Sequence, residues 1–168
     1  ASTNAVITNS TGAVTASNTA TTAQADTISA FAKAVVYNVS GTAAEIVAAS
    51  AAARNEAVNI TISDDATIAQ ATTAEDATNS GTVTVATITD TAANIAASTN
   101  AVITNSTGAV TASNAATVAQ ATTIDAFAKA VVFAVSDTAA AIAASSNAAL
   151  DEATSVTASD TATTAQAD

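Results

Sequence analysis

Apolar and polar residues alternate in seven short stretches of the chain, and every stretch ends at a serine or a threonine. The residues one and three positions before this end are apolar, as Val39 and Tyr37 are before Ser40. A period of two with many β-branched residues is typical of a strand with one buried face. We therefore expect seven strands, with Val39, Ile62, Ile88 and Val135 pointing inward. The predicted strand ends are Ser17, Ser40, Ser63, Thr89, Ser113, Ser136 and Ser159.

The chain repeats itself on two scales. Residues 1–18 recur unchanged at 97–114, and residues 30–44 recur with few changes at 126–140, so the long repeat has 96 residues. Within it, successive strand ends lie 23 to 26 residues apart and define seven short repeats. Periods of this length are typical of solenoids and arrays. We expect residues 1–168 to form a single repeat array, with 1–96 a complete long repeat and 97–168 an incomplete one.

An alanine-rich stretch follows each predicted strand and starts with Asp, Asn or Gly, which predicts a helix. Ala occupies the third position after every strand end. Ala and Ile alternate at the sixth, so we expect neighbouring helices to interdigitate. Thr is a mediocre helix former, so the Thr-rich helices at 20–31, 66–77 and 116–127 should be short or partly extended. The predicted fold is an α/β solenoid of seven strand–turn–helix coils of about 24 residues with a stacked parallel sheet.

Composition removes several classes of function. The 168 residues include 51 Ala and 32 Thr but no Cys or His, which excludes disulfides, the usual zinc sites and His- or Cys-based catalysis. A net charge of −11 would repel nucleic acid. No apolar run approaches the roughly 18 residues of a membrane span. A thin alanine-packed solenoid offers no cleft for paired catalytic carboxylates, so we expect neither an enzyme nor a cofactor.

The first and last residues fall at nearly the same phase of the short repeat. Residue 1 corresponds to residue 97, eight past Thr89, and residue 168 lies nine past Ser159. A free solenoid needs polar caps over its open sheet edges, and no such cap is visible in the sequence. We expect a segment of a longer array, or a subunit that stacks head to tail with like subunits. Proline at Thr157 should then block stacking by removing an amide donor.

Three strings carry a resemblance to known proteins: ITDTAANIAAS (88–98), VSDTAAAIAAS (135–145) and ATVAQATTIDA (116–126). They resemble the Ala/Thr-rich tandem repeats of very large bacterial secreted and surface proteins, many of them adhesin-like or surface-layer-like. The resemblance covers nearly the whole chain. It implies an extracellular or cell-surface location and a structural role in a filament, stalk or surface coat, without catalytic residues. Such proteins often carry Gly-Asp-rich calcium repeats, and this chain has none.

A column of Asp, Asn and Gly follows the predicted strands. Carboxylates stacked about 5 Å apart suit Ca²⁺, a hard cation that takes oxygen ligands. Alternatively, each side chain caps its own helix, which we favour because Asn and Gly interrupt the column and are good caps. We also expect the glutamines of the Ala-Gln-Ala motifs to face inward and bond to the backbone of the neighbouring coil. The calcium candidates are Asp64, Asp90, Asp137 and Asp160, and the glutamines are Gln24, Gln70, Gln120 and Gln166.

The outward row of the strands suggests a second function. Flat arrays of Thr and Ser hydroxyls and methyls are similar to the Thr-x-Thr ranks of ice-binding solenoids, so the alternative is an ice- or crystal-surface binder. Asn38 and Ala134 interrupt this row. Thr and Ser are also ordinary residues on an exposed strand face. The candidate surface residues are Thr15, Ser17, Thr61, Ser63, Thr87, Thr89, Thr111, Ser113, Thr157 and Ser159.

Overall fold

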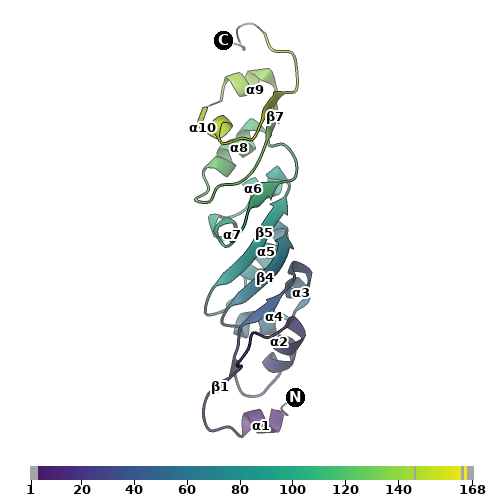
Figure 1. The fold of residues 1–168 in the computed structure, drawn as a ribbon, viewed down its shortest axis with the longest axis vertical. Coiled ribbons are helices and arrows are strands. Elements are labelled where there is room, and N and C mark those ends of the chain that lie inside the picture. Colours follow the sequence, from purple (N-terminus) through teal and green to yellow (C-terminus); the bar gives the residue numbers. More distant parts are fainter. Residues whose placement is uncertain (1–3, 146, 164, 166–168) are drawn as a thin grey trace. The chain divides into compact units, whose positions relative to one another are not determined.

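The computed structural model describes residues 4–145, 147–163 and 165. The chain divides into two compact units, Ala1–Ala86 and Thr87–Asp168. Both units combine short helices with parallel strands (Figure 1). This confirms the α/β class and the parallel pairing that the repeated succession of strand and helix predicts.

The first unit is built from α1 to α5 and β1 to β4. Its elements are α1 (Asn4–Thr8), β1 (Val14–Thr15), α2 (Thr22–Ser29), β2 (Val35–Val36), β3 (Val39–Gly41), α3 (Ala43–Ala48), α4 (Ala51–Glu56), β4 (Ile60–Ala66) and α5 (Ile68–Glu75). Strand β5 (Val83–Asp90) begins in this unit and ends in the second. Within the first unit α2 packs on α4 and α3 packs on α5.

The second unit continues the same alternation. Its further elements are α6 (Ala92–Ala96), α7 (Asn100–Thr104), β6 (Val110–Ala112), α8 (Val118–Asp125), β7 (Val135–Asp137), α9 (Ala139–Ala143), α10 (Asn147–Asp151) and β8 (Val156–Ala158). Here α6 packs on α8, and α8 packs on α10.

Each of the seven predicted strands has a counterpart in the described residues, but β2 is an additional strand, and the strands do not form one continuous sheet. The strands form a pair β1-β2, a sheet of order β3-β4-β5-β6 and a pair β7-β8, all parallel where the register is known. Isolated parallel bridges such as Ala20↔Val39 and Ala116↔Val135 lie beside them. These two bridges are related by 96 residues, as are the pairs Val39↔Ile60 and Val135↔Val156. The long repeat therefore reproduces its backbone pairing in each unit.

The register corrects the alignment of the short repeats on their strand ends. Ser40 lies beside Thr61 rather than Ser63, and Ser136 lies beside Thr157 rather than Ser159. The shift is two residues, so the inward face is preserved. Val39, Ile62, Ile88 and Val135 are at most 1 % exposed, as predicted.

The helices of the Thr-rich repeats correct a second expectation. We expected them to be short or partly extended, but α2, α5 and α8 have eight residues each and are the longest of the helices described. Each starts at a Thr N-cap with Gln three residues later, so a complete capping box forms. Capping outweighs the modest helix propensity of Thr, which costs only a few tenths of a kcal/mol per residue.

The position of the N-cap also decides which face of each helix is buried. It lies four residues after Ser17, at Thr21, but two residues after Ser40, at Thr42. The fourth helical residue is buried in both cases, as Ala25 and Ile46, each 0 % exposed. Ala23, Ala69 and Ala119 are consequently exposed, so the predicted interdigitation of these alanines with the isoleucines is wrong.

Candidate functional site

Side-chain oxygens within or just after the strands cap helices of the preceding short repeat. Asp64 Oδ1 accepts from the Ala43 N–H, the first of α3, at 2.7 Å. The same contact recurs three times: the Ala92 N–H donates to Asn114 Oδ1 (2.8 Å), the Ala139 N–H to Asp160 Oδ1 (2.6 Å) and the Val118 N–H to Asp137 Oδ2 (3.0 Å). The first N–H groups of a helix have no partner within it. The polar column therefore ties each of these strands to a helix about 20 residues earlier.

All four calcium candidates are engaged by amide donors. Besides the contacts above, Asp90 Oδ1 accepts from Thr91 N–H and Asn94 Nδ2, both at 2.7 Å, and Asp137 Oδ1 accepts from Thr138 N–H at 2.8 Å. The prediction that each Asx caps its own helix is therefore wrong for these residues: Thr occupies the N-cap, and Asp64, Asn114, Asp137 and Asp160 each reach a helix of the preceding short repeat. Within the described ranges no group of three or more Asp and Glu residues is arranged to hold a metal ion.

The glutamines act within their own helices. Oε1 of Gln24, Gln70 and Gln120 accepts from the N–H of the N-cap Thr, at 2.9 Å in each case. The expectation of bonds to a neighbouring repeat is wrong for these three, and Gln166 lies outside the described residues. The Thr-x-x-Gln spacing that signals a capping box is visible in the sequence.

A second ladder of side chains joins short repeats in the first unit. Asn38 Oδ1 accepts from the Asn59 N–H (3.2 Å) and Nδ2 (3.0 Å). Asn59 Oδ1 in turn accepts from the Thr82 N–H (2.9 Å) and Oγ1 (3.0 Å). Sequence reasoning treated Asn38 only as an interruption of the outward row. Its role depends on the strand register, which no local spacing reveals.

The Thr/Ser face does not form aligned ranks. Thr15 lies beside Val36, and Thr111 lies beside Thr89 on one side and bridges Val132 on the other. Val36 and Val132 are 46 % and 47 % exposed, so apolar side chains interrupt the face. Of the candidate residues, Thr61, Thr87, Thr89 and Thr111 are half-buried, and Thr15, Ser17, Ser63, Ser113, Thr157 and Ser159 are exposed.

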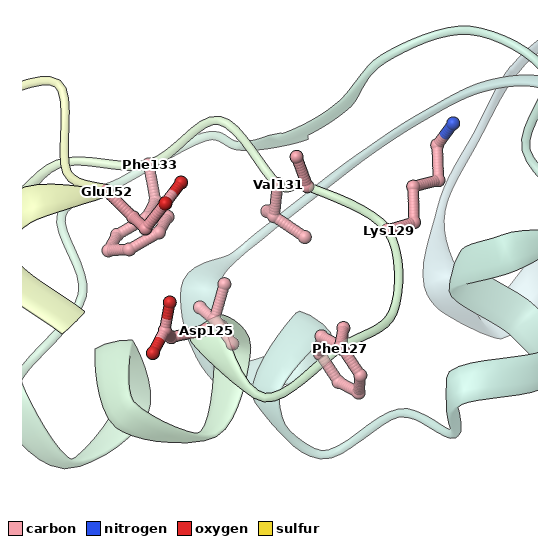
Figure 2. Close-up of a pocket in the computed structure, with 8 residues that line it drawn as sticks. Asp125, Phe127, Lys129, Val131, Phe133 and Glu152 are labelled. Atoms are coloured by element: carbon pink, nitrogen blue, oxygen red, sulfur yellow. The ribbon is translucent and has the colours of Figure 1, made fainter. Parts of the chain in front are cut away.

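A small cavity in the second unit gathers charged and aromatic side chains (Figure 2). It measures about 190 Å³ and is lined by Asp125, Phe127, Lys129, Phe133 and Glu152 among others. Figure 2 shows the two carboxylates on one side and the Lys129 ammonium on the other, pointing away from them. Ligand pockets usually measure about 300–1,000 Å³. Because both carboxylates are exposed and the cavity is small, it makes a weak candidate for catalysis.

The two ends expose residues whose counterparts in the long repeat are buried. Val6 is 63 % exposed, whereas Val102, in the identical sequence 97–114, is 2 % exposed. At the other end Val156 is 41 % exposed, and its counterpart Ile60 is 0 % exposed. Ile60 donates its N–H to the Thr82 carbonyl of the following short repeat (3.0 Å). These end surfaces and the polar column are the most distinctive features of the described chain.

No described helix has the length and apolar character needed to cross a membrane. Comparisons with family models, with curated proteins and with solved structures found no match to this chain.

Proposed function

We propose that the chain is a non-enzymatic structural repeat protein of the bacterial cell surface or extracellular space. Its coils continue one another as a solenoid, and it forms or extends a filament, stalk or surface coat by stacking head to tail. Its partners are like subunits or neighbouring repeats, with no cofactor and no nucleic acid. The resemblance of its Ala/Thr-rich repeats to those of large secreted proteins supports this location.

The observation that carries this proposal is the use of the polar side chains. In four cases a side-chain oxygen accepts a hydrogen bond from the first N–H of a helix in the preceding short repeat. The residues that supply these oxygens are Asp64, Asn114, Asp137 and Asp160. Side chains that hold one repeat to the next stabilise an array, because each repeat buries its faces only against its neighbours. A heterologous contact between the two ends of such an array propagates instead of closing.

Charge sets the conditions for stacking. The net charge of −11 opposes association of identical subunits at low ionic strength. Screening relieves this repulsion as the Debye length falls from about 30 Å at 0.01 M to about 8 Å at 0.15 M salt. We expect light scattering to rise with salt and electron microscopy to show fibres or stacked columns. A monomer at high protein concentration across this range of salt would refute the proposal.

A proline variant tests whether growth uses the free edge of β8. Val135 N–H donates to the Ser155 carbonyl and Ser159 N–H donates to the Asp137 carbonyl, both at 2.8 Å. Since bonding residues alternate along a parallel strand, Thr157 also faces β7, and the predicted proline at Thr157 would break an internal bond. Val156→Pro removes a donor from the free edge instead. It should abolish salt-dependent growth and leave the far-ultraviolet circular dichroism unchanged.

The ice-binding alternative remains a separate prediction. The register beside Val36 and Val132 does not favour it. Thermal hysteresis of the isolated chain is the measurement that decides, because a structural filament has no reason to slow the growth of ice.

A further inference from the structure

An open groove lies beside β1 in the first unit. It has a volume of about 650 Å³, and its walls come from α1, β1 and α2. Its apolar lining includes Ile7, Val14, Ala20, Ile28 and Phe31, and the polar residues Ser17 and Asn18 also line it. Val14, Ile7 and Ile28 are half-buried in this groove.

The long repeat contains a second copy of these walls. Residues 97–114 are identical to 1–18, and α8 is the counterpart of α2. In the second unit the groove is covered by residues 88–96: the end of β5 pairs with β6, with Ile88 beside Val110, and α6 packs on α8. Val110 and Ile124, the counterparts of Val14 and Ile28, are then 0 % and 2 % exposed.

The covering segment also satisfies three polar groups of the second copy. Ile88 N–H donates to the Ala109 carbonyl (3.1 Å), and Ser113 N–H donates to the Asp90 carbonyl (2.8 Å). Ala92 N–H donates to Asn114 Oδ1 (2.8 Å). The corresponding groups of the groove are the Ala13 carbonyl, the Ser17 N–H and Asn18 Oδ1. None of these three has a hydrogen bond within the part of the chain that the structure describes.

We infer that the groove is a docking site for a strand–helix segment with the sequence of residues 87–96. The segment adds as a parallel strand beside β1, with its Ile88 against Val14 and its helix on α2. It donates to the Ala13 carbonyl and Asn18 Oδ1 and accepts from the Ser17 N–H. The main-chain hydrogen bonds to β1 provide affinity, and the apolar side chains fix the register of the docked strand against β1.

This inference deepens the proposed function, since it names what the end of the array accepts. The inference also predicts which sequence the groove beside β1 binds more tightly. The last described strand, β8, corresponds in the long repeat to β4 and not to β5, and its flanking sequence TSVTASD lacks the isoleucine pattern of TVATITD. In a folded like subunit the 87–96 segment already pairs with β6, so head-to-tail stacking brings the β8 end to the groove instead. The groove should bind a free 87–96 segment more tightly than it binds that β8 end.

The test adds a copy of residues 73–96 directly before Ala1 of the full chain, so that this junction repeats the natural step from residue 96 to residue 97. Hydrogen exchange of individual amides is then measured by NMR at a concentration where the protein is monomeric. We expect exchange at Ser17 to slow at least about tenfold and to approach that of Ser113, because a docked strand closes its N–H. A synthetic peptide of residues 82–99, added to the unmodified chain, should shift the same resonances.

Two matched controls keep the result specific. In the first, the added copy carries aspartate in place of both its isoleucines, Ile88 and Ile95, and should give no protection at Ser17. In the second, Asn18→Ala should speed exchange at the Ala92 amide of the added copy, and Asn9→Ala, outside the groove, should not. Unchanged exchange at Ser17, or equal slowing by the control extension, would overturn the inference. Because this assay uses monomers, failure of fibre growth would count against the proposed function alone.

Discussion

Tyr37 and Phe133 occupy equivalent positions of the long repeat, and both are 2 % exposed. They differ in one atom that matters, because Tyr37 Oη donates to the Ala53 carbonyl at 2.8 Å. Phe133 lines the small cavity of the second unit instead. Both units therefore bury an aromatic ring at this position, and the ring of Tyr37 adds a hydrogen bond that Phe133 cannot form.

Tyr37→Phe should lower the free energy of unfolding by about 0.5–1.5 kcal/mol, the usual net contribution of one intramolecular hydrogen bond. Urea denaturation of the variant and the parent protein measures the difference. Phe133→Tyr is the matched control, and it should leave stability unchanged or raise it because the cavity beside Phe133 can admit a hydroxyl. Equal stability of Tyr37→Phe and the parent would show that the bond to Ala53 contributes nothing.

The Tyr37 hydroxyl also makes the free energy of unfolding depend on pH in the alkaline range. Burial, reinforced by the nearby Glu56 and Asp26, raises the pKa of Tyr37 from 10.0 to about 12. The folded state therefore holds this proton more tightly than the unfolded state, and stability falls as the pH rises from 10 to about 12. The informative quantity is the difference in the free energy of unfolding between the parent protein and Tyr37→Phe, because the two differ only in this hydroxyl. That difference should shrink with rising pH, and a constant difference would contradict the assignment.

At the scale of the element, capping decides where helices begin. Thr supplies the N-cap of α2, α3, α5, α6, α7, α8 and α9, and Ser50 supplies that of α4. Arg54 of α4 closes the other end of α3 by donating to the carbonyls of Ile46, Val47 and Ala49. A cation at a helix C-terminus is also favoured by the helix dipole. Short alanine-rich helices are marginal alone, so these end contacts are a large part of what defines them.

Asp64→Ala should destabilise the chain by about 0.5–2 kcal/mol, the usual cost of losing a helix cap. The loss should appear at α3, as faster hydrogen exchange of the Ala43 amide, although the two residues are 21 positions apart. Asp64→Asn is the matched control and should retain most of the stability, since Asn114 caps α6 in the same way. Faster exchange in α5 alone, with Ala43 unaffected, would mean that the contact across repeats is not the one that matters.

Gln70→Ala should weaken α5 by removing the acceptor of the Thr67 N–H (2.9 Å). The expected cost is below that of Thr67→Ala, because Thr67 Oγ1 serves the helix amide of Gln70 as the N-cap, which is worth about 1 kcal/mol. Urea denaturation of both single variants gives the comparison. The reverse order of the two effects would show that Gln70 stabilises through another contact.

At the scale of the whole molecule, the polar column stabilises the described chain through hydrogen bonds from its side-chain oxygens to backbone amides. We expect the melting temperature to be the same in excess chelator and in millimolar calcium, because Asp64, Asp90, Asp137 and Asp160 already accept amide protons. A bound ion would stabilise by mass action and raise the melting temperature. A rise of several degrees in calcium would therefore show that the column binds the ion.

Much of this architecture follows from the sequence by itself. The two-residue period placed Val39, Ile62, Ile88 and Val135 in the core, because alternation of side chains is a property of any strand. The recurrence of the sequence after 96 residues likewise accounts for the pairing that the two units share. The Thr-x-x-Gln spacing also held the information for the capping boxes, although Thr content alone led to the wrong expectation for α2, α5 and α8.

Only the tertiary structure decided how one repeat meets the next. A shift of two residues leaves the same side chains inside, so the hydrophobic pattern cannot distinguish Ser40 beside Thr61 from Ser40 beside Ser63. That register places Asp64 on Ala43, Asn38 on Asn59 and Val36 beside Thr15. The Ser113 N–H and Asn114 Oδ1 are hydrogen-bonded to the segment beside β6, whereas the Ser17 N–H and Asn18 Oδ1 face the groove, because β1 pairs with β2 alone. Local pattern determines which residues are buried, whereas contacts between repeats depend on strand register, which is set by packing between neighbouring strands and helices.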